Sequence, residues 1–222
     1  MRPQLIFCIV LTGSLLLAFA VAQEPGLIRG TVIDEKGMPV AAARVRVDPM
    51  NGLPRSDLVR EVETNESGHF LMDNLAPGSY KLFAMKETAG YPNTAFAFYS
   101  NHVFPTATLT PSAPAIELIL KIGPPAGVIH GSVRDARTTT PIAASFHLRR
   151  VADPDNWISL SQRPEYRVLI PPSTEVSIEV SAPGHQTFYY AGAMDPLRRP
   201  PLQLESRKEL KLDIELQPVD TP

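Results

Sequence analysis

Cysteine is almost absent from this chain of 222 residues, whose one cysteine is Cys8. Cys8 lies inside an apolar N-terminal stretch, and the preceding Leu5-Ile6-Phe7 lacks the small side chains of a lipoprotein site. Without a second cysteine the chain cannot form an internal disulfide, so core packing has to stabilise its fold. Beyond Cys8 it also has no thiol nucleophile.

Long apolar stretches are scarce as well, and the one from Leu5 to about Val21 is at the N-terminus. It follows a basic start at Arg2 and ends in Ala20-Val21-Ala22. These features are typical of a secretory signal peptide, so we expect residues 1–22 to be removed by cleavage after Ala22. An uncleaved N-terminal anchor is the alternative. The mature chain is expected to be secreted or periplasmic, with no membrane span.

The sequence also lacks a basic run and any catalytic motif. Residues 23–222 have 20 basic and 23 acidic side chains, a formal charge of −3 that argues against a nucleic-acid partner. There is no Gly-x-Ser-x-Gly or His-Glu-x-x-His segment, and the five histidines do not share the spacing of metal ligands. We therefore expect no metal, no cofactor and no enzymatic activity, with a small hydrolase or metal-dependent enzyme as a remote alternative. Isolated positions in turns or on the surface are the expected places of the histidines at 69, 102, 130, 147 and 185.

Proline, in contrast, is abundant, at 23 of 222 residues. This is about twice its usual share, and the prolines are spaced too closely for long helices. Between them, apolar and polar residues alternate with the period of two that is typical of strands with one wet face. The clearest stretches are 40–47, 115–122, 142–148 and 210–216, and we interpret 58–64 as a further strand.

One segment occurs twice. Gly-Thr-Val-Ile-Asp at 30–34 is followed by Gly37 and Pro39, and Gly-Ser-Val-Arg-Asp at 131–135 is followed by Pro141. In each copy we expect the aspartate, Asp34 or Asp135, to cap the turn after a strand, and the proline to fix φ where the chain becomes extended again. The repetition predicts a tandem of two small β domains.

Three ordered segments of the first copy resemble the carboxypeptidase regulatory-like domain family. They are Gly-x-Val-x-Asp-x-x-Gly-x-Pro-Val at 30–40, the Gly68 turn within Thr-Asn-Glu-Ser-Gly-His-Phe at 64–70, and Asn-Leu-Ala-Pro-Gly-Ser-Tyr at 74–80. In the last of these, Pro77 and Gly78 suit the central positions of a type II turn. The resemblance implies an all-β fold of seven-stranded, transthyretin-like (prealbumin-like) β-sandwiches, a type often grouped as carbohydrate-binding-like. The family's members are accessory modules without a catalytic residue set.

We accordingly divide the chain into a regulatory-like sandwich at 23–122, a Gly/Pro linker at 123–127 and a second, divergent sandwich at 128–222. The expected function is that of a secreted, non-catalytic binding or assembly module of the bacterial cell envelope, with an envelope protein or a polysaccharide as its partner. Which sheet edge would be free to bind a partner strand stays open at this point.

The densest aromatic stretch, 91–104, supplies the candidate binding residues. Exposed rings stack on sugar faces while neighbouring amides and imidazoles bond to hydroxyl groups, so the alternative function is a carbohydrate-binding module. The opposing interpretation is that Phe96, Phe98 and Phe104 fill the core, because Phe96 and Phe98 alternate as strand residues do. The candidate ligand-binding residues are Tyr91, Phe98, Tyr99, Asn101, His102 and, outside the stretch, the single tryptophan, Trp157.

Overall fold

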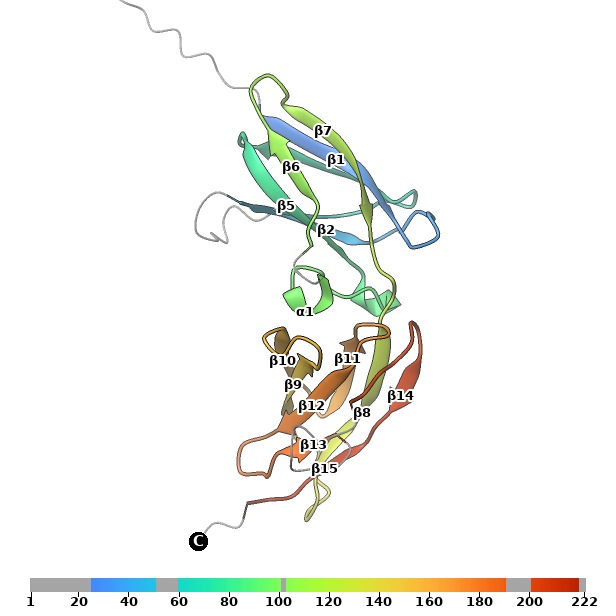
Figure 1. Ribbon diagram of the computed structural model, residues 1–222, viewed down its shortest axis with the longest axis vertical. Coiled ribbons are helices and arrows are strands. Elements are labelled where there is room, and N and C mark those ends of the chain that lie inside the picture. The colour runs from blue at the N-terminus through green and yellow to red at the C-terminus, as the bar shows by residue number, and fades with distance from the viewer. Residues whose placement is uncertain (1–24, 51–59, 101–102, 191–200, 220–222) are drawn as a thin grey trace, which may run out of the picture.

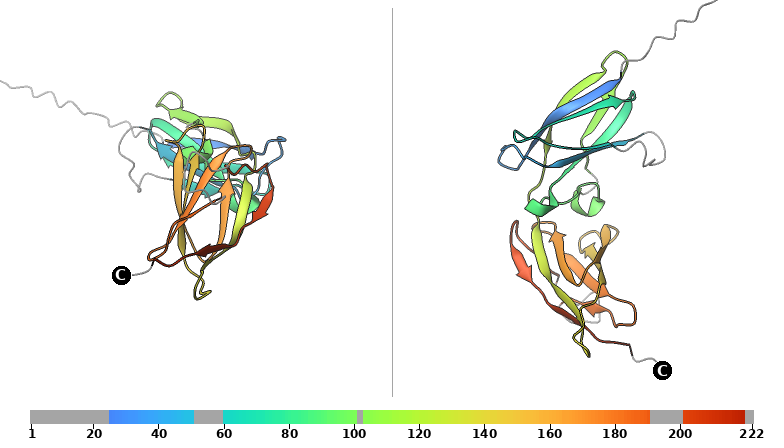
Figure 2. Two further views of the ribbon diagram at one scale, coloured as in Figure 1. Left: turned by 60° about the horizontal axis from the view of Figure 1, so that its bottom comes forward. Right: turned by 180° about the vertical axis from the view of Figure 1, so that it is seen from behind.

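The computed structural model describes residues 25–50, 60–100, 103–190 and 201–219. The expected signal peptide, its cleavage site and the candidates Asn101 and His102 lie outside these ranges. The described chain is all-β, as predicted, and its four sheets form two β-sandwich domains, at about 26–121 and 127–216. Figure 1 shows the two domains end to end, and the right-hand view of Figure 2 shows this arrangement from behind.

The described residues of the first domain form seven strands in two sheets. One sheet has the order β4-β1-β7, with β7 parallel to β1, and the other has the order β3-β2-β5-β6. The strands are β1 (Gly26–Ile33), β2 (Arg44–Pro49), β3 (Arg60–Glu63), β4 (His69–Leu75), β5 (Gly78–Met85), β6 (Thr106–Leu109) and β7 (Ala115–Lys121). A 3-10 turn, η1 (Glu87–Ala89), and one helical turn, α1 (Ala97–Ser100), lie between β5 and β6.

The second domain repeats this topology. Its sheets have the orders β10-β9-β12-β13 and β11-β8-β14, and β15 also pairs with β8. Both β14 and β15 run parallel to β8, as β7 does to β1. The strands are β8 (Gly127–Asp135), β9 (Ala144–Arg150), β10 (Trp157–Gln162), β11 (Glu165–Ile170), β12 (Val176–Ser181), β13 (Phe188–Tyr189), β14 (Glu209–Lys211) and β15 (Ile214–Leu216).

The repeated glycine has a steric cause. Gly30 is paired with Phe70 and Gly131 with Tyr166, at the same place in each domain. A Cβ on Gly30 would collide with the backbone carbonyl of Leu118, and one on Gly131 with that of Leu212. Only glycine allows the parallel closing strand to approach so closely.

The repeated aspartate closes the turn that follows. Oδ1 of Asp34 accepts hydrogen bonds from the backbone N–H groups of Lys36 and Met38, at 2.9 and 2.8 Å. Oδ1 of Asp135 accepts from those of Arg137 and Thr138, at 2.8 and 2.7 Å. The carboxylates replace missing backbone acceptors in these turns.

The remaining turn residues named from the sequence lie at strand ends. Gly37 and Gly68 have φ values of 80° and 75°, in the left-handed region. Pro39 bridges to Ile33, and Pro141 bridges to Arg134.

Three local details differ from the sequence-based expectations. The second strand begins at Arg44 rather than Val40, because Ala42 takes a φ of 49°. Gly78 has a φ of 157° and begins β5, so it is not the left-handed residue of a type II turn. The closing strand at 210–216 is interrupted where the Asp213 carboxylate accepts hydrogen bonds from the N–H and hydroxyl groups of Ser132, at 2.9 and 3.0 Å.

Among the described residues, no helix has the length and apolar character needed to cross a membrane.

Candidate functional site at the domain joint

The long connection between β5 and β6 leaves the first sandwich and reaches the second. Figure 1 shows its helical turn, α1, between the two domains. The connection belongs to the first domain by sequence, but α1 contacts β10 of the second. It contains most of the aromatic stretch that the sequence singled out.

Phe98 completes the hydrophobic core of the second domain. Its side chain is fully buried among residues of that core, such as Phe146, Leu148 and Ile158. Its ring also meets that of Tyr99 edge to face, with 5.1 Å between centroids. Burying a phenylalanine side chain contributes about 2 kcal/mol of transfer free energy, and here that contribution depends on both domains being present.

Side chains of the second domain satisfy two of the carbonyl groups of α1, those of Ala97 and Phe98. A helix this short has no partners of its own for its last carbonyls. Arg150 donates from Nε and Nη2 to the Phe98 carbonyl, at 3.0 and 2.7 Å, and its guanidinium lies 5.8 Å from the Phe98 ring centroid. Asn156 donates from Nδ2 to the Ala97 carbonyl, at 3.4 Å. Burial lowers the pKa of Arg150, an effect that nearby Asp153 opposes.

Tyr99 connects α1 to the other sheet of the second domain. Its hydroxyl donates to the backbone carbonyl of Leu169 in β11, at 3.1 Å. Burial, and to a smaller extent the Glu87 carboxylate, raises the pKa of Tyr99 well above its usual range. The hydroxyl therefore stays protonated and remains a donor at any physiological pH.

Charged residues surround this contact. Arg167 donates to the backbone carbonyl of Glu87, at 3.0 Å. Arg207 Nη2 lies 3.1 Å from Glu35 Oε1 and 3.4 Å from the hydroxyl of buried Tyr91. These side chains add hydrogen bonds between the domains at the edge of the Phe98 contact.

The linker is held on both sides. The backbone N–H of Ala126 donates to the carbonyl of Gly90 at 2.8 Å, and the Ala126 carbonyl accepts from the N–H of Arg207 at 3.1 Å. Gly123 has a φ of 97° and packs so closely on the Tyr91 ring that a Cβ would lie 2.8 Å from it. The direct connection between the domains is thus tied to the first domain through Gly90 and to the second through Arg207.

The structure does not gather those sequence-predicted ligand residues that it describes on one exposed surface. Tyr91 and Phe98 are buried and Tyr99 is half-buried, all at the joint, so their rings present no open face for a sugar. The reason is that α1 packs on a second hydrophobic core, a contact that short-range patterns do not show. Trp157, in contrast, is 53% exposed on the outer face of β10, more than 50 residues away along the chain.

Trp157 belongs to a small polar and aromatic surface. Its ring lies 5.0 Å from that of His147 on the neighbouring strand β9, at an interplanar angle of 37°. Arg149 is its cross-strand partner, and Arg149 Nη2 approaches His147 Nε2 at 3.5 Å. Together these three residues form the Trp157 surface.

His185 is not an isolated surface residue, contrary to our expectation for the histidines. Its Nε2 lies 2.9 Å from Asp135 Oδ2, and its Nδ1 lies 2.9 Å from the Pro183 carbonyl oxygen. Since both oxygens accept, both ring nitrogens have to donate, which requires the imidazolium form. The bond to Asp135 raises the pKa of His185, while hydrogen bonds from Thr138 and His185 lower that of Asp135. Asp135 thus joins two turns at the far end of the domain.

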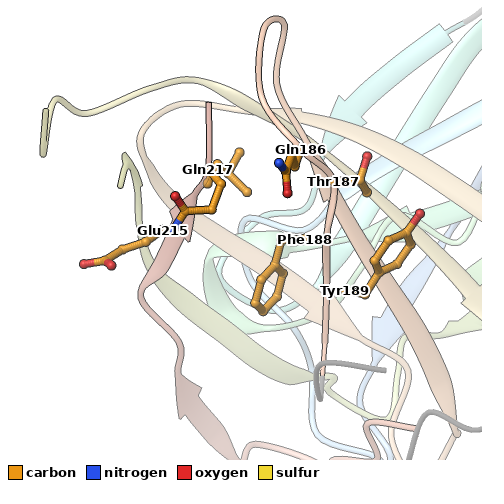
Figure 3. A pocket seen from close by; sticks show the side chains of 7 residues that line it. Gln186, Thr187, Phe188, Tyr189, Glu215 and Gln217 are labelled. Atoms are coloured by element: carbon orange, nitrogen blue, oxygen red, sulfur yellow. The ribbon is translucent and has the colours of Figure 1, made fainter. Parts of the chain in front are cut away.

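A hollow of about 490 Å³ lies at one edge of the second domain, between β13 and β15. Figure 3 shows its lining residues, among which the Glu215 carboxylate points away from the ring of Phe188. The described lining has one carboxylate and no histidine, so it does not bring ionisable groups together as a catalytic pocket does. Within the described ranges no three His, Cys, Asp or Glu residues are placed to hold a metal ion.

Sequence reasoning missed the polar half of the joint. Arg150 follows Arg149 directly, and only the strand register shows which of the two turns toward the Phe98 carbonyl. Asn156 lies in an Asp-Pro-Asp-Asn segment whose composition is typical of an exposed turn, yet it is buried. No local signal separates these residues from exposed polar ones.

These features define a protein of two tandem β-sandwiches joined by a packed contact. Residues 27–112 match the model of the carboxypeptidase regulatory-like domain family, so the first sandwich is similar to domains of this family. The search of curated proteins found no match.

Among solved structures, the TIE protein of Bacillus anthracis is 14% identical, with a TM-score of 0.36, over 88% of this chain and 34% of that one. A streptococcal ancillary pilin is 12% identical, with a TM-score of 0.34, over 90% of this chain and 64% of that one. GBS52, a minor pilin of Streptococcus agalactiae, is 15% identical, with a TM-score of 0.35, over 89% and 98%. The present chain therefore spans less than two thirds of the length of the first two.

Replacing Phe98 by alanine should destabilise the second domain and uncouple it from the first. We expect its free energy of unfolding to fall by about 3 to 5 kcal/mol, because the substitution leaves a cavity in a packed core. Urea unfolding, monitored by the fluorescence of Trp157, measures this directly. Phe96→Ala is the matched control, since Phe96 lies two residues away and is 47% exposed. It should cost no more than about 0.5 kcal/mol, and equal losses in the two variants would contradict the described joint.

The His185–Asp135 pair should make stability depend on pH. Because the pKa of His185 is raised above its ordinary 6.5 in the folded state, its contribution is complete below pH 6.5 and is lost as the pH rises through the folded-state value. The lowered pKa of Asp135 sets the other limit, since its contribution begins to fall below its ordinary 3.8. The difference in unfolding free energy between wild type and His185→Gln should thus be largest between pH 3.8 and pH 6.5. A difference that stays constant from pH 5 to 9 would show that the pair is not charged.

Proposed function

We propose that the protein is a rigid, two-domain assembly module that is exported to the bacterial cell envelope and works by binding rather than catalysis. The observation that carries the proposal is Phe98, which is supplied by the first domain and is fully buried in the core of the second. A flexible tether would need no such contact. The packed joint instead supports a role in which the two sandwiches keep a fixed separation and orientation.

Other observations agree with this role. The first domain resembles regulatory-like domains, a non-catalytic type, and the hollow between β13 and β15 brings no set of ionisable groups together in the described structure. Export is supported by the N-terminal sequence alone, and a mature N-terminus at Gln23, detected by mass spectrometry, would test it. The envelope partner is a protein or a polysaccharide.

Small-angle X-ray scattering of residues 23–222 tests the rigidity of the joint. The wild-type curve should fit a single arrangement of the two domains at all temperatures below unfolding. Phe98→Ala, examined where both domains are still folded, should require a broad range of arrangements, whereas Phe96→Ala should match the wild type. A wild-type curve that already requires many arrangements would refute the proposed role.

A second candidate function is saccharide binding at the Trp157 surface, which replaces the aromatic stretch as the carbohydrate-binding alternative. An exposed tryptophan beside a histidine and an arginine offers a stacking face with hydrogen-bond donors next to it. Trp157 is the only tryptophan of the chain, so its fluorescence reports binding without a label. Titration with neutral and uronic-acid polysaccharides should shift and saturate the emission, and Arg149→Ala should weaken the effect. An unchanged spectrum with every polysaccharide would remove this candidate.

A further inference from the structure

The sheet edges of this protein differ in how well they are protected against pairing with another strand. Exposed edge strands usually carry charged residues, or are very short, because their unpaired backbone groups would otherwise recruit a further strand. Most edges here follow this rule. Charged side chains occur in β3, β4, β7, β11, β14 and β15, while β6 has four residues and β13 has two.

β10 is the exception among the described edge strands. It has six residues, Trp-Ile-Ser-Leu-Ser-Gln, with no charge, proline or glycine. It lies at the end of the sheet order β10-β9-β12-β13, so one of its sides has no strand partner in the described part of the chain. Its outward side chains, Trp157, Ser159 and Ser161, are exposed, and its core-facing Leu160 is only half-buried.

The backbone bonds show which groups of β10 point outward. The N–H of Arg150 donates to the carbonyl of Asn156, at 3.1 Å, which makes these two residues a hydrogen-bonded pair of the antiparallel ladder. Such pairs alternate along a ladder, so the next residue, Trp157, turns its N–H and C=O away from β9. The same holds for Ser159 and Ser161. Trp157, Ser159 and Ser161, at every second position of β10, thus present backbone N–H donors and C=O acceptors at the free edge.

We propose that this edge binds a second copy of the chain, by antiparallel pairing of β10 with β10 about a two-fold axis at Ser159. In this register Ser159 pairs with Ser159 of the second copy, and Trp157 with its Ser161. All three outward-pointing residues of each strand then exchange backbone bonds. The two four-stranded sheets become one continuous sheet of eight strands.

Both faces of the strand fit this register. Ile158 and Leu160 both face the core, and in this register Ile158 lies directly opposite Leu160 of the second copy. Each Ile158 therefore covers the half-exposed side of the other copy's Leu160. On the outer face, the large Trp157 ring lies over small Ser161. A two-fold interface has to be complementary to itself, and this strand offers a large residue for a small one on each side.

The absence of charge favours a second copy over a different partner. Complementary charges help to select and align a foreign partner, and β10 has none to offer. The outward side chains at its two ends, Trp157 and Ser161, differ in size rather than in charge. This suits pairing with an identical strand that runs the opposite way. Residues 23–222 contain no cysteine, so the proposed dimer would not depend on a disulfide.

This inference rests on the proposed assembly role and names its partner, but it concerns β10 rather than the joint. Sedimentation velocity of residues 23–222, over a wide range of concentrations, should show a reversible monomer–dimer equilibrium. Ser159→Lys should raise the dimer dissociation constant about fivefold or more, because it places two lysines opposite each other at the axis. Ser159→Glu should do the same. An equimolar mixture of the two variants should recover the dimer, since opposite charges then meet.

Ser181→Lys is the matched control, because Ser181 is exposed on the outer face of β12, away from the free edge. It should dimerise as the wild type does. Circular dichroism and thermal unfolding establish that each variant is folded. A wild type that is monomeric at every concentration would overturn the inference, as would a folded Ser159→Lys that dimerises normally or a mixture that fails to recover the dimer. The scattering test of the joint uses curves extrapolated to concentrations at which the chain is monomeric, so the two proposals fail independently.

Discussion

The arrangement of this protein depends on the burial of one side chain, Phe98, in the core of the second domain, against which Tyr99 of the same helical turn also packs. The ring fills the end of the second sandwich, and Arg150 and Asn156 satisfy the carbonyl groups that the short helix leaves without partners. Apolar burial alone would allow the helix to slide, whereas the hydrogen bonds fix its position. Together they convert a connection within the first domain into the contact between the two.

The sequence predicted the features that depend on residues close together in the chain, namely the strands and the tandem repeat. Alternating side chains indicated the strands, and the repeated segment of glycine and aspartate indicated the tandem, because both patterns are visible along the sequence itself. The position of the aromatic stretch was not predictable in this way. Phe96 and Phe98 would share a face in a strand, but a helical turn separates them by about 200°, so that one is exposed and the other buried.

The same distinction between local and distant partners applies to Asp135. Its role in the turn follows from its place after a strand, and one carboxylate oxygen performs it. The other oxygen binds His185, which is 50 residues away, and that contact exists only because β12 ends beside the turn after β8. The second domain is therefore held by side-chain hydrogen bonds at both ends, one set facing the joint and the other facing away from it.

The parallel pairing of first and last strands determines how the molecule would bear a stretching force. A pull applied at the start of β1 and transmitted through the end of β7 draws two parallel neighbours in opposite directions, so all seven residue pairs between them are loaded together. The second domain repeats the geometry with β8, β14 and β15. Bonds loaded in shear have to break together, whereas bonds loaded from one end open one after another. Each sandwich is thus arranged to resist tension along the line that joins the two domains.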